Sequence, residues 1–171
     1  MQVGALLADG FGRLAEEVGA VVPGLDTDGL NWRWEGEGNS IAWLVWHLTR
    51  IQDDHIADAF GQEQVWLTGG WQQRFALPLE PQDTGYGHSS DEVAAVRVES
   101  ADLLLGYFAA VQKPSLAAVT RLRPDDLDRI VDTSWDPPVT LGVRLVSVLS
   151  DGLQHIGQAA LVKGLLRHAE L

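Results

Sequence analysis

An aspartate and a histidine lie four residues apart near the end of the sequence, at Asp151 and His155. If this segment is helical, the two side chains share one face, with their Cβ atoms about 5–6 Å apart. Helical zinc proteases present two metal ligands at the same spacing. A carboxylate on an apolar helix face is costly unless it is paired or binds a cation. The pair therefore predicts two ligands of a metal site, and an ion pair inside a core is the alternative.

A third ligand is available from an earlier segment with helical periodicity, which contains His47 and His55. These histidines are eight residues apart, or about 12 Å along a helix axis, so they cannot bind the same ion. The spacing alone leaves open which of them completes the site. Of the other histidines, His88 follows a glycine and is expected to face solvent. His168 is expected in a last helical turn, where a cation suits the helix dipole.

Four segments have the apolar spacing of amphipathic helices and must position these side chains. The first two run over 3–22 and 41–59, and Ser40 or Asn39 is a suitable N-cap for the second. The third begins at Ser89 with a capping-box pattern and is expected to be interrupted at Pro114. The fourth runs over 141–166. Four helices with two long connections predict an all-α four-helix bundle, formed as a single domain by residues 1–171.

The start of the second segment is apolar on every side, from Ile41 to Trp46. Such a helix must be covered all round, either by its own domain or by a second subunit. Trp43 and Trp46 are expected to point away from the inner stripe, so they could line a pocket or a dimer interface. The pattern favours a homodimer, and a covering loop is the alternative. The acidic pair Asp53 and Asp54 is expected on a solvated face.

Composition excludes several classes of protein. The chain has 12 basic and 24 acidic residues, a net charge of −12, so nucleic acid and anionic membranes are poor partners. Because it has no cysteine, disulfides, thiolate metal sites and cysteine nucleophiles are excluded, and any metal must be bound by His, Asp or Glu. The N-terminus does not resemble a signal peptide and no stretch of about 18 apolar residues occurs, so a cytoplasmic location is expected.

Two stretches of the sequence resemble motifs of the DinB-like (damage-inducible) four-helix family. One is residues 39–48, NSIAWLVWHL, followed by QDDH at 52–55, which resembles the second helix of that family. The other is residues 151–158, DGLQHIGQ, which resembles its last helix. The order of helices and long connections resembles that family over nearly the whole chain.

The resemblance implies a divalent metal in the bundle core, with His47, Asp151 and His155 as ligands. It therefore favours His47 over His55. Many relatives carry histidine at the position of Asp151, so a carboxylate there is a departure that exchanges a neutral ligand for an anion. Two imidazoles and one carboxylate suit Zn²⁺ with an open coordination position, and Ni²⁺, Fe²⁺ or Mn²⁺ are alternatives.

Characterised members of the family imply a thiol-dependent activity. They include a mycothiol-dependent maleylpyruvate isomerase and transferases that use mycothiol or bacillithiol, so a small electrophile and a low-molecular-weight thiol are the expected partners. A non-catalytic, dimeric stress protein that binds a metal or an apolar ligand is the alternative. Candidates for the surroundings of the site are Asp54 as a hydrogen-bond acceptor or base, Gln158 as a polar wall, and Trp43 as a pocket residue.

Overall fold

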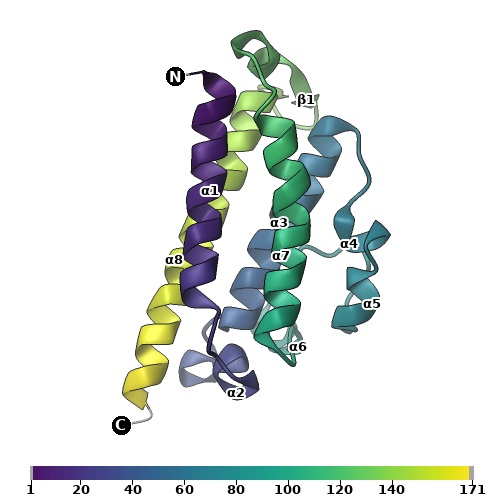
Figure 1. Cartoon of the computed structure of the whole chain (residues 1–171). Helices are drawn as coiled ribbons and strands as arrows, with labels where there is room; N and C mark the ends of the chain where they lie inside the picture. The colour runs from purple at the N-terminus through teal and green to yellow at the C-terminus, as the bar shows by residue number, and fades with distance from the viewer. Residues whose placement is uncertain (1, 170–171) are drawn as a thin grey trace.

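Four long helices form the body of the computed structural model, which describes residues 2–169 (Figure 1). They are α1 (Val3–Val21), α3 (Ile41–Phe60), α7 (Ala101–Val119) and α8 (Leu141–Ala169). Helices α1 and α3 lie diagonally opposite each other, and each packs against both α7 and α8. The all-α four-helix bundle predicted from the sequence is confirmed.

Short elements connect the long helices. Between α1 and α3 lie α2 (Thr27–Asn31) and the 3-10 helix η1 (Trp34–Gly36). The crossover from α3 to α7 contains α4 (Val65–Thr68), α5 (Trp71–Phe75) and α6 (Ser90–Ala95) and returns the chain to the other end of the bundle, so α7 runs parallel to α3 (Figure 1). The last connection holds the 3-10 helix η2 (Pro124–Asp128) and an antiparallel hairpin of β1 (Ile130–Asp132) and β2 (Val139–Thr140), with Ile130 opposite Thr140.

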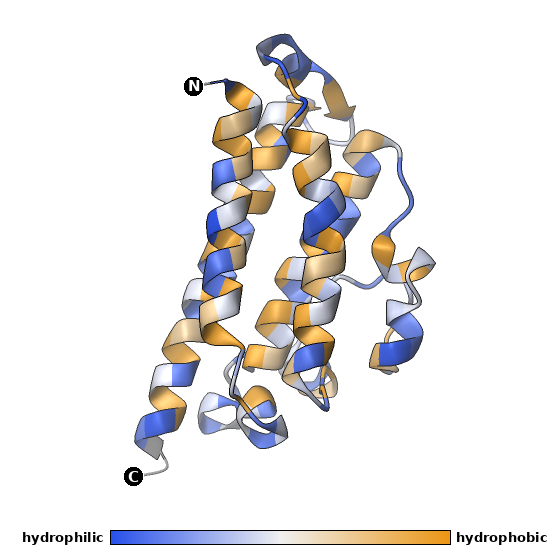
Figure 2. Cartoon of the chain, in the orientation of Figure 1, coloured by the Kyte–Doolittle hydropathy of each residue, from blue (hydrophilic) through white to orange (hydrophobic). Residues whose placement is uncertain are grey.

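Apolar residues recur along all four long helices (Figure 2), and their buried members form two clusters. The larger cluster includes the whole apolar start of α3 together with Trp66, Phe75 and Val93 of the crossover. Trp43 and Trp46 are therefore buried by their own chain, and the covering-loop alternative accounts for the all-round apolar pattern. The homodimer interface suggested for residues 41–46 is wrong. None of the helices within residues 2–169 is both long and apolar enough to cross a bilayer.

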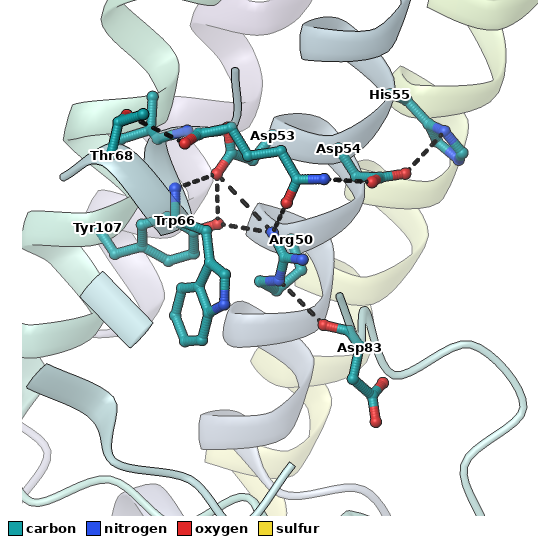
Figure 3. A network of polar contacts seen from close by, with 10 residues as sticks. Arg50, Asp53, Asp54, His55, Trp66, Thr68, Asp83 and Tyr107 are labelled. Atoms are coloured by element: carbon teal, nitrogen blue, oxygen red, sulfur yellow. Dashed lines mark hydrogen bonds and ion pairs between the residues drawn. The ribbon is translucent and has the colours of Figure 1, made fainter. Parts of the chain in front are cut away.

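Buried charges on α3 hold the crossover in place (Figure 3). The Asp53 carboxylate accepts hydrogen bonds from the backbone N–H groups of Val65 (2.8 Å) and Trp66 (2.7 Å), the first two residues of α4. It also accepts one from the Tyr107 hydroxyl (2.8 Å). Arg50 is fully buried, and its Nε donates to the carbonyl oxygen of Asp83 (3.0 Å). The expected solvent exposure of Asp53 is wrong, because the residue is only 3% exposed and its carboxylate caps the N-terminus of α4.

Two expectations for the third helix are also wrong. The chain leaves the helical conformation after Ala95, because the side-chain amide of Asn31 pairs with the backbone of Val98 through two hydrogen bonds of 2.8 and 2.9 Å. Ser100 then caps α7 as a new helix. Pro114 lies within α7 without ending it. Packing of the buried residues around it outweighs the loss of one helical hydrogen bond.

We expect Asp53→Ala to lower the free energy of unfolding by about 3–5 kcal/mol, because the change leaves the Arg50 guanidinium buried without a counter-charge. Chemical denaturation followed by circular dichroism measures this. Asp58→Ala is the control, since Asp58 is an exposed aspartate on the same helix and its loss should cost less than about 0.5 kcal/mol. Equal effects of the two changes would contradict the anchoring role of Asp53.

Candidate metal centre

Three of the side chains singled out from the sequence meet where α3 crosses α8. His47 comes from α3, and Asp151 and His155 come from adjacent turns of α8. His47 Nε2 lies 3.9 Å from Asp151 Oδ1, and His155 Nδ1 lies 3.4 Å from Asp151 Oδ2. Each residue offers one ligand atom, and these atoms all lie within 4.8 Å of one another. The structure therefore brings together two imidazoles and a carboxylate from distant parts of the chain.

Local sequence places these side chains at the crossing. Ser40 caps α3 by accepting a hydrogen bond from the Trp43 backbone N–H, so His47 lies in the second turn of a well-defined helix. On α8, Gly152 lets the helix approach α1 closely, since a Cβ atom there would lie 2.7 Å from the Leu14 side chain. That close packing fixes the rotation of α8. Asp151 and His155 consequently face α3.

The hydrogen bond of His47 determines which nitrogen can bind a metal. His47 Nδ1 lies 2.5 Å from the carbonyl oxygen of Thr84, which can only accept, so Nδ1 carries the proton. Nε2 then presents its lone pair toward Asp151. Burial lowers the pKa of His47 and outweighs this hydrogen bond, which raises the pKa, so the neutral form is favoured. Metal-binding histidines commonly donate their second N–H to a carbonyl group in this way.

One oxygen of the Asp151 carboxylate lacks a hydrogen-bond partner. Its Oδ2 atom is buried and has no hydrogen bond among the described residues, although two imidazoles lie nearby. A buried acceptor left without a partner is costly, and more so when it is charged. Together with the neutral His47, this orphaned oxygen fits a divalent cation, which would compensate the negative charge between the two rings.

His155 is held by Asp151 as well. Its Nδ1 donates to the backbone carbonyl oxygen of Asp151 at 2.8 Å. Burial alone would lower the pKa of His155, but the hydrogen bond to the Asp151 carbonyl oxygen and the nearby charge of the Asp151 carboxylate raise it by more, and the net shift is upward. Protonation therefore competes with metal binding more strongly at His155 than at His47.

A layer of side chains covers the imidazole of His47. The indole of Trp43 is stacked on it with the ring centres 4.6 Å apart and the planes at 9°. Trp43 Nε1 donates to His88 Nδ1 (3.1 Å), and His88 Nε2 donates to Asp83 (3.0 Å). The expectation that His88 faces solvent is wrong, because its side chain is only 4% exposed. It keeps Trp43 against the site.

The loop of residues 83–88 presses directly on His47, and sequence reasoning missed it. Gly85 has a φ of +87°, and a Cβ atom there would lie 2.8 Å from His47 Nδ1. Glycine is needed at this position because a positive φ disfavours other residues and because a Cβ atom would collide with the His47 ring. Nothing in the side chains marks the loop as a partner of the site, since the group that binds His47 is the backbone carbonyl of Thr84. The available signal was the pair of glycines, Gly85 and Gly87, beside a histidine.

The remaining candidates lie apart from the three-residue cluster. His55 Nδ1 lies 3.3 Å from Arg144 and 3.5 Å from Asp54, and Asp54 accepts a hydrogen bond from Gln64 (2.6 Å). His55 and Asp54 line a cavity of about 490 Å³ that also includes Thr84, which connects it to His47. Gln158 is exposed on α8.

Comparison with known proteins agrees with this fold. The sequence profile described as the DinB superfamily matches residues 11–159. The chain belongs to the DinB superfamily. A crystal structure of a conserved protein from Enterococcus faecalis superposes with a TM-score of 0.88 at 29% sequence identity, covering 95% of this chain and 96% of that one. No curated protein matches this DinB-superfamily chain.

We expect Gly85→Ala to weaken divalent-metal binding by about 10- to 100-fold, the usual effect of disturbing a group that orients a metal ligand. The added methyl group must displace either the His47 ring or the loop that holds it. Titration with Zn²⁺ in competition with a chromophoric chelator measures the dissociation constant. Gly87→Ala is the control, because Gly87 has a similar φ of +76° but open space around it. If both variants bind as the parent does, the loop does not position His47.

Proposed function

We propose that this member of the DinB superfamily binds one divalent metal ion through His47, Asp151 and His155. The observation that carries the proposal is the buried Asp151 oxygen that lacks a partner between two imidazoles, one of them with its lone pair directed inward. Three ligands of these types leave a coordination position open on Zn²⁺, the metal we favour, and also suit Ni²⁺, Fe²⁺ or Mn²⁺.

We further propose that the site activates a low-molecular-weight thiol, such as mycothiol or bacillithiol, for attack on an electrophile. A divalent metal bound there supplies a positive charge and an open position, which favour the thiolate form of a thiol. In a transferase reaction the S–H proton leaves to a base, the sulfur forms a bond to the electrophilic carbon, and the leaving group departs with its electron pair. In an isomerase reaction the sulfur adds to a conjugated double bond and is later expelled.

The cavity of about 490 Å³ beside His47 is the proposed place for the organic part of these substrates. Ile51, one turn along α3 from His47, forms its inner wall, and Tyr86 and Trp135 are exposed on its rim. Asp54 lines the same cavity and is the candidate acceptor for the thiol proton. We place the protein in the cytoplasm, where small thiols are kept reduced.

Metal binding is tested by elemental analysis of the purified protein after incubation with Zn²⁺ and removal of the excess. We expect one metal ion per chain, and we expect His155→Ala and Asp151→Ala to lose it, because each removes one of three ligands. Gln158→Ala is the matched control, since Gln158 is exposed on the same helix and should leave the stoichiometry unchanged. A stoichiometry of zero in the parent protein, or full occupancy in both ligand variants, contradicts the proposal.

Thiol chemistry is tested with the Zn²⁺-loaded protein, a chromogenic aryl halide, and mycothiol or bacillithiol. We expect thiol-dependent product formation that falls at least about 100-fold in His155→Ala, because the thiolate is no longer stabilised. A holoprotein that binds metal but is inactive with both thiols and several classes of electrophile would exclude the enzyme and leave the alternative, a non-catalytic metal- or apolar-ligand-binding stress protein. One feature favours that alternative: the anionic Asp151 lowers the positive charge that a metal offers to a thiolate.

A further inference from the structure

A second cavity, of about 400 Å³, lies toward the end of the bundle where α3 begins (Figure 1). Its walls come from α2, from the end of α5 and the residues that follow it, and from the segment that joins α6 to α7. No residue of α3 or α8 lines it, so it shares no side chain with the metal centre. A cavity of this volume is within the range of pockets that bind small molecules.

Two arginines at the mouth of this cavity have no carboxylate partner. Arg74 and Arg97 are both exposed and line it from different walls. Among residues 2–169, the arginines that form ion pairs with carboxylates are Arg13, Arg50, Arg123 and Arg144. Acidic residues outnumber basic ones by 24 to 12, so a shortage of carboxylates does not explain why both guanidiniums are free. Guanidinium groups offer planar sets of N–H donors that suit a carboxylate or a phosphate.

The guanidinium of Arg74 is already positioned by the indole of Trp71. Its Cζ atom lies over that ring, 4.5 Å from the ring centre. Trp71 is fixed in turn by two glycines, since a Cβ atom at Gly106 would lie 2.9 Å from the ring and one at Gly69 would lie 2.7 Å from it. Stacking covers a face of the guanidinium and leaves the N–H groups at its edge available. Binding an anion at Arg74 therefore costs little side-chain entropy.

Arg97 is held at the mouth by the extended segment that follows α6. Val96 and Val98 are only 1% and 2% exposed, so the alternation of an extended chain turns Arg97 outward, where it lines the cavity. The two hydrogen bonds between the Asn31 side chain and the backbone of Val98 fix this segment against α2. The backbone that carries Arg97 is therefore fixed without any ligand.

The interior of the cavity suits an apolar group. Phe75 is buried in its wall, and Leu77 and Leu103 line it as half-buried residues. The polar side chains of α2 already have partners. Asn31 donates from its amide to two backbone carbonyl oxygens, and the Thr27 hydroxyl donates to a third. A ligand that matches this arrangement carries its charge at the mouth and its apolar part inside.

We propose that this cavity binds a small organic anion, whose carboxylate or phosphate pairs with Arg74 and Arg97 and whose apolar part packs against Phe75 and Leu103. Glu99 also lines the cavity, and its single negative charge weakens the attraction without cancelling that of two arginines. The net charge of −12 disfavours a large polyanion, so the ligand is a small molecule. The proposal depends on neither the metal nor the thiol chemistry.

Calorimetric titration of the full chain with 3-phenylpropionate, phenyl phosphate and the neutral 3-phenylpropionamide tests the ligand class. We expect at least one of the two anions to bind with a dissociation constant below about 1 mM. The amide should bind at least about tenfold more weakly, because it lacks the charge that strengthens hydrogen bonds from a guanidinium. The tighter of the two anions identifies the preferred acidic group. Equal binding of the amide, or no binding of either anion up to about 10 mM, overturns the proposal.

Substitutions at the mouth test the position of the anion. We expect Arg74→Gln and Arg97→Gln each to weaken binding at least about tenfold, because each removes a charged donor. Arg121→Gln is the matched control, since Arg121 is exposed and lies outside the cavity, and the same loss of charge should leave the affinity unchanged. Glu99→Gln should bind at least as tightly as the parent. Equal weakening in all three arginine variants would show a general charge effect and contradict the site.

An open coordination position on a metal also attracts anions, so the metal centre is tested as the rival site. We expect His155→Ala to bind the anion as the parent does. Binding that is lost in His155→Ala and retained in Arg97→Gln would place the anion on the metal, which overturns this proposal and supports the metal centre. NMR of the parent protein gives a readout that needs no variant. The anion should shift the side-chain Nε–H signals of Arg74 and Arg97, and unchanged signals at saturation would contradict the proposal.

Discussion

The hydrogen bond from the His47 imidazole to the carbonyl oxygen of Thr84 connects the fold to the site. It settles the tautomer of His47 and directs the Nε2 lone pair toward α8. The bond exists only because the crossover loop lies against α3, and that placement depends on buried charges. Arg50 holds the backbone of Asp83 immediately before Thr84, while Asp53 caps α4 at the other end of the crossover (Figure 3). The long connection between α3 and α7 is thus part of the site.

Asp151 accounts for the chemistry that this arrangement favours. A carboxylate with a buried, unpartnered oxygen between two aromatic nitrogens is stable only if something compensates its charge. Protonation of His155 can do so in part, and its raised pKa reflects that pairing. A divalent cation would compensate it more completely and would engage both imidazoles at once. A neutral histidine at position 151 would carry no buried charge to compensate. With aspartate there, metal binding should therefore stabilise the folded protein more than it would with histidine.

Much of the fold was predictable, since local periodicity and capping signals mark the long helices. Asp151 and His155 were predictable as a pair because residues four apart share a helix face. The choice of His47 over His55 came from the family resemblance, because helical spacing could not show which histidine lies level with Asp151 and His155 along α8. Contacts between distant backbone groups were not predictable. The pairing of Asn31 with Val98, the carbonyl of Thr84 on His47 and the burial of Asp53 and His88 all depend on how the crossover folds back over α3.

X-ray absorption spectroscopy at the metal edge, on protein loaded with one equivalent of Zn²⁺, tests the central claim most directly, because it counts imidazole ligands without requiring a substrate. Two imidazoles and at least one further oxygen ligand are predicted for the parent protein. His47→Ala is predicted to lose the metal, and with it the imidazole signal, because the change removes one of three ligands, whereas the control His55→Ala should keep two imidazoles. A spectrum with oxygen ligands alone, or one in which loss of His55 removes an imidazole and loss of His47 does not, would contradict the account.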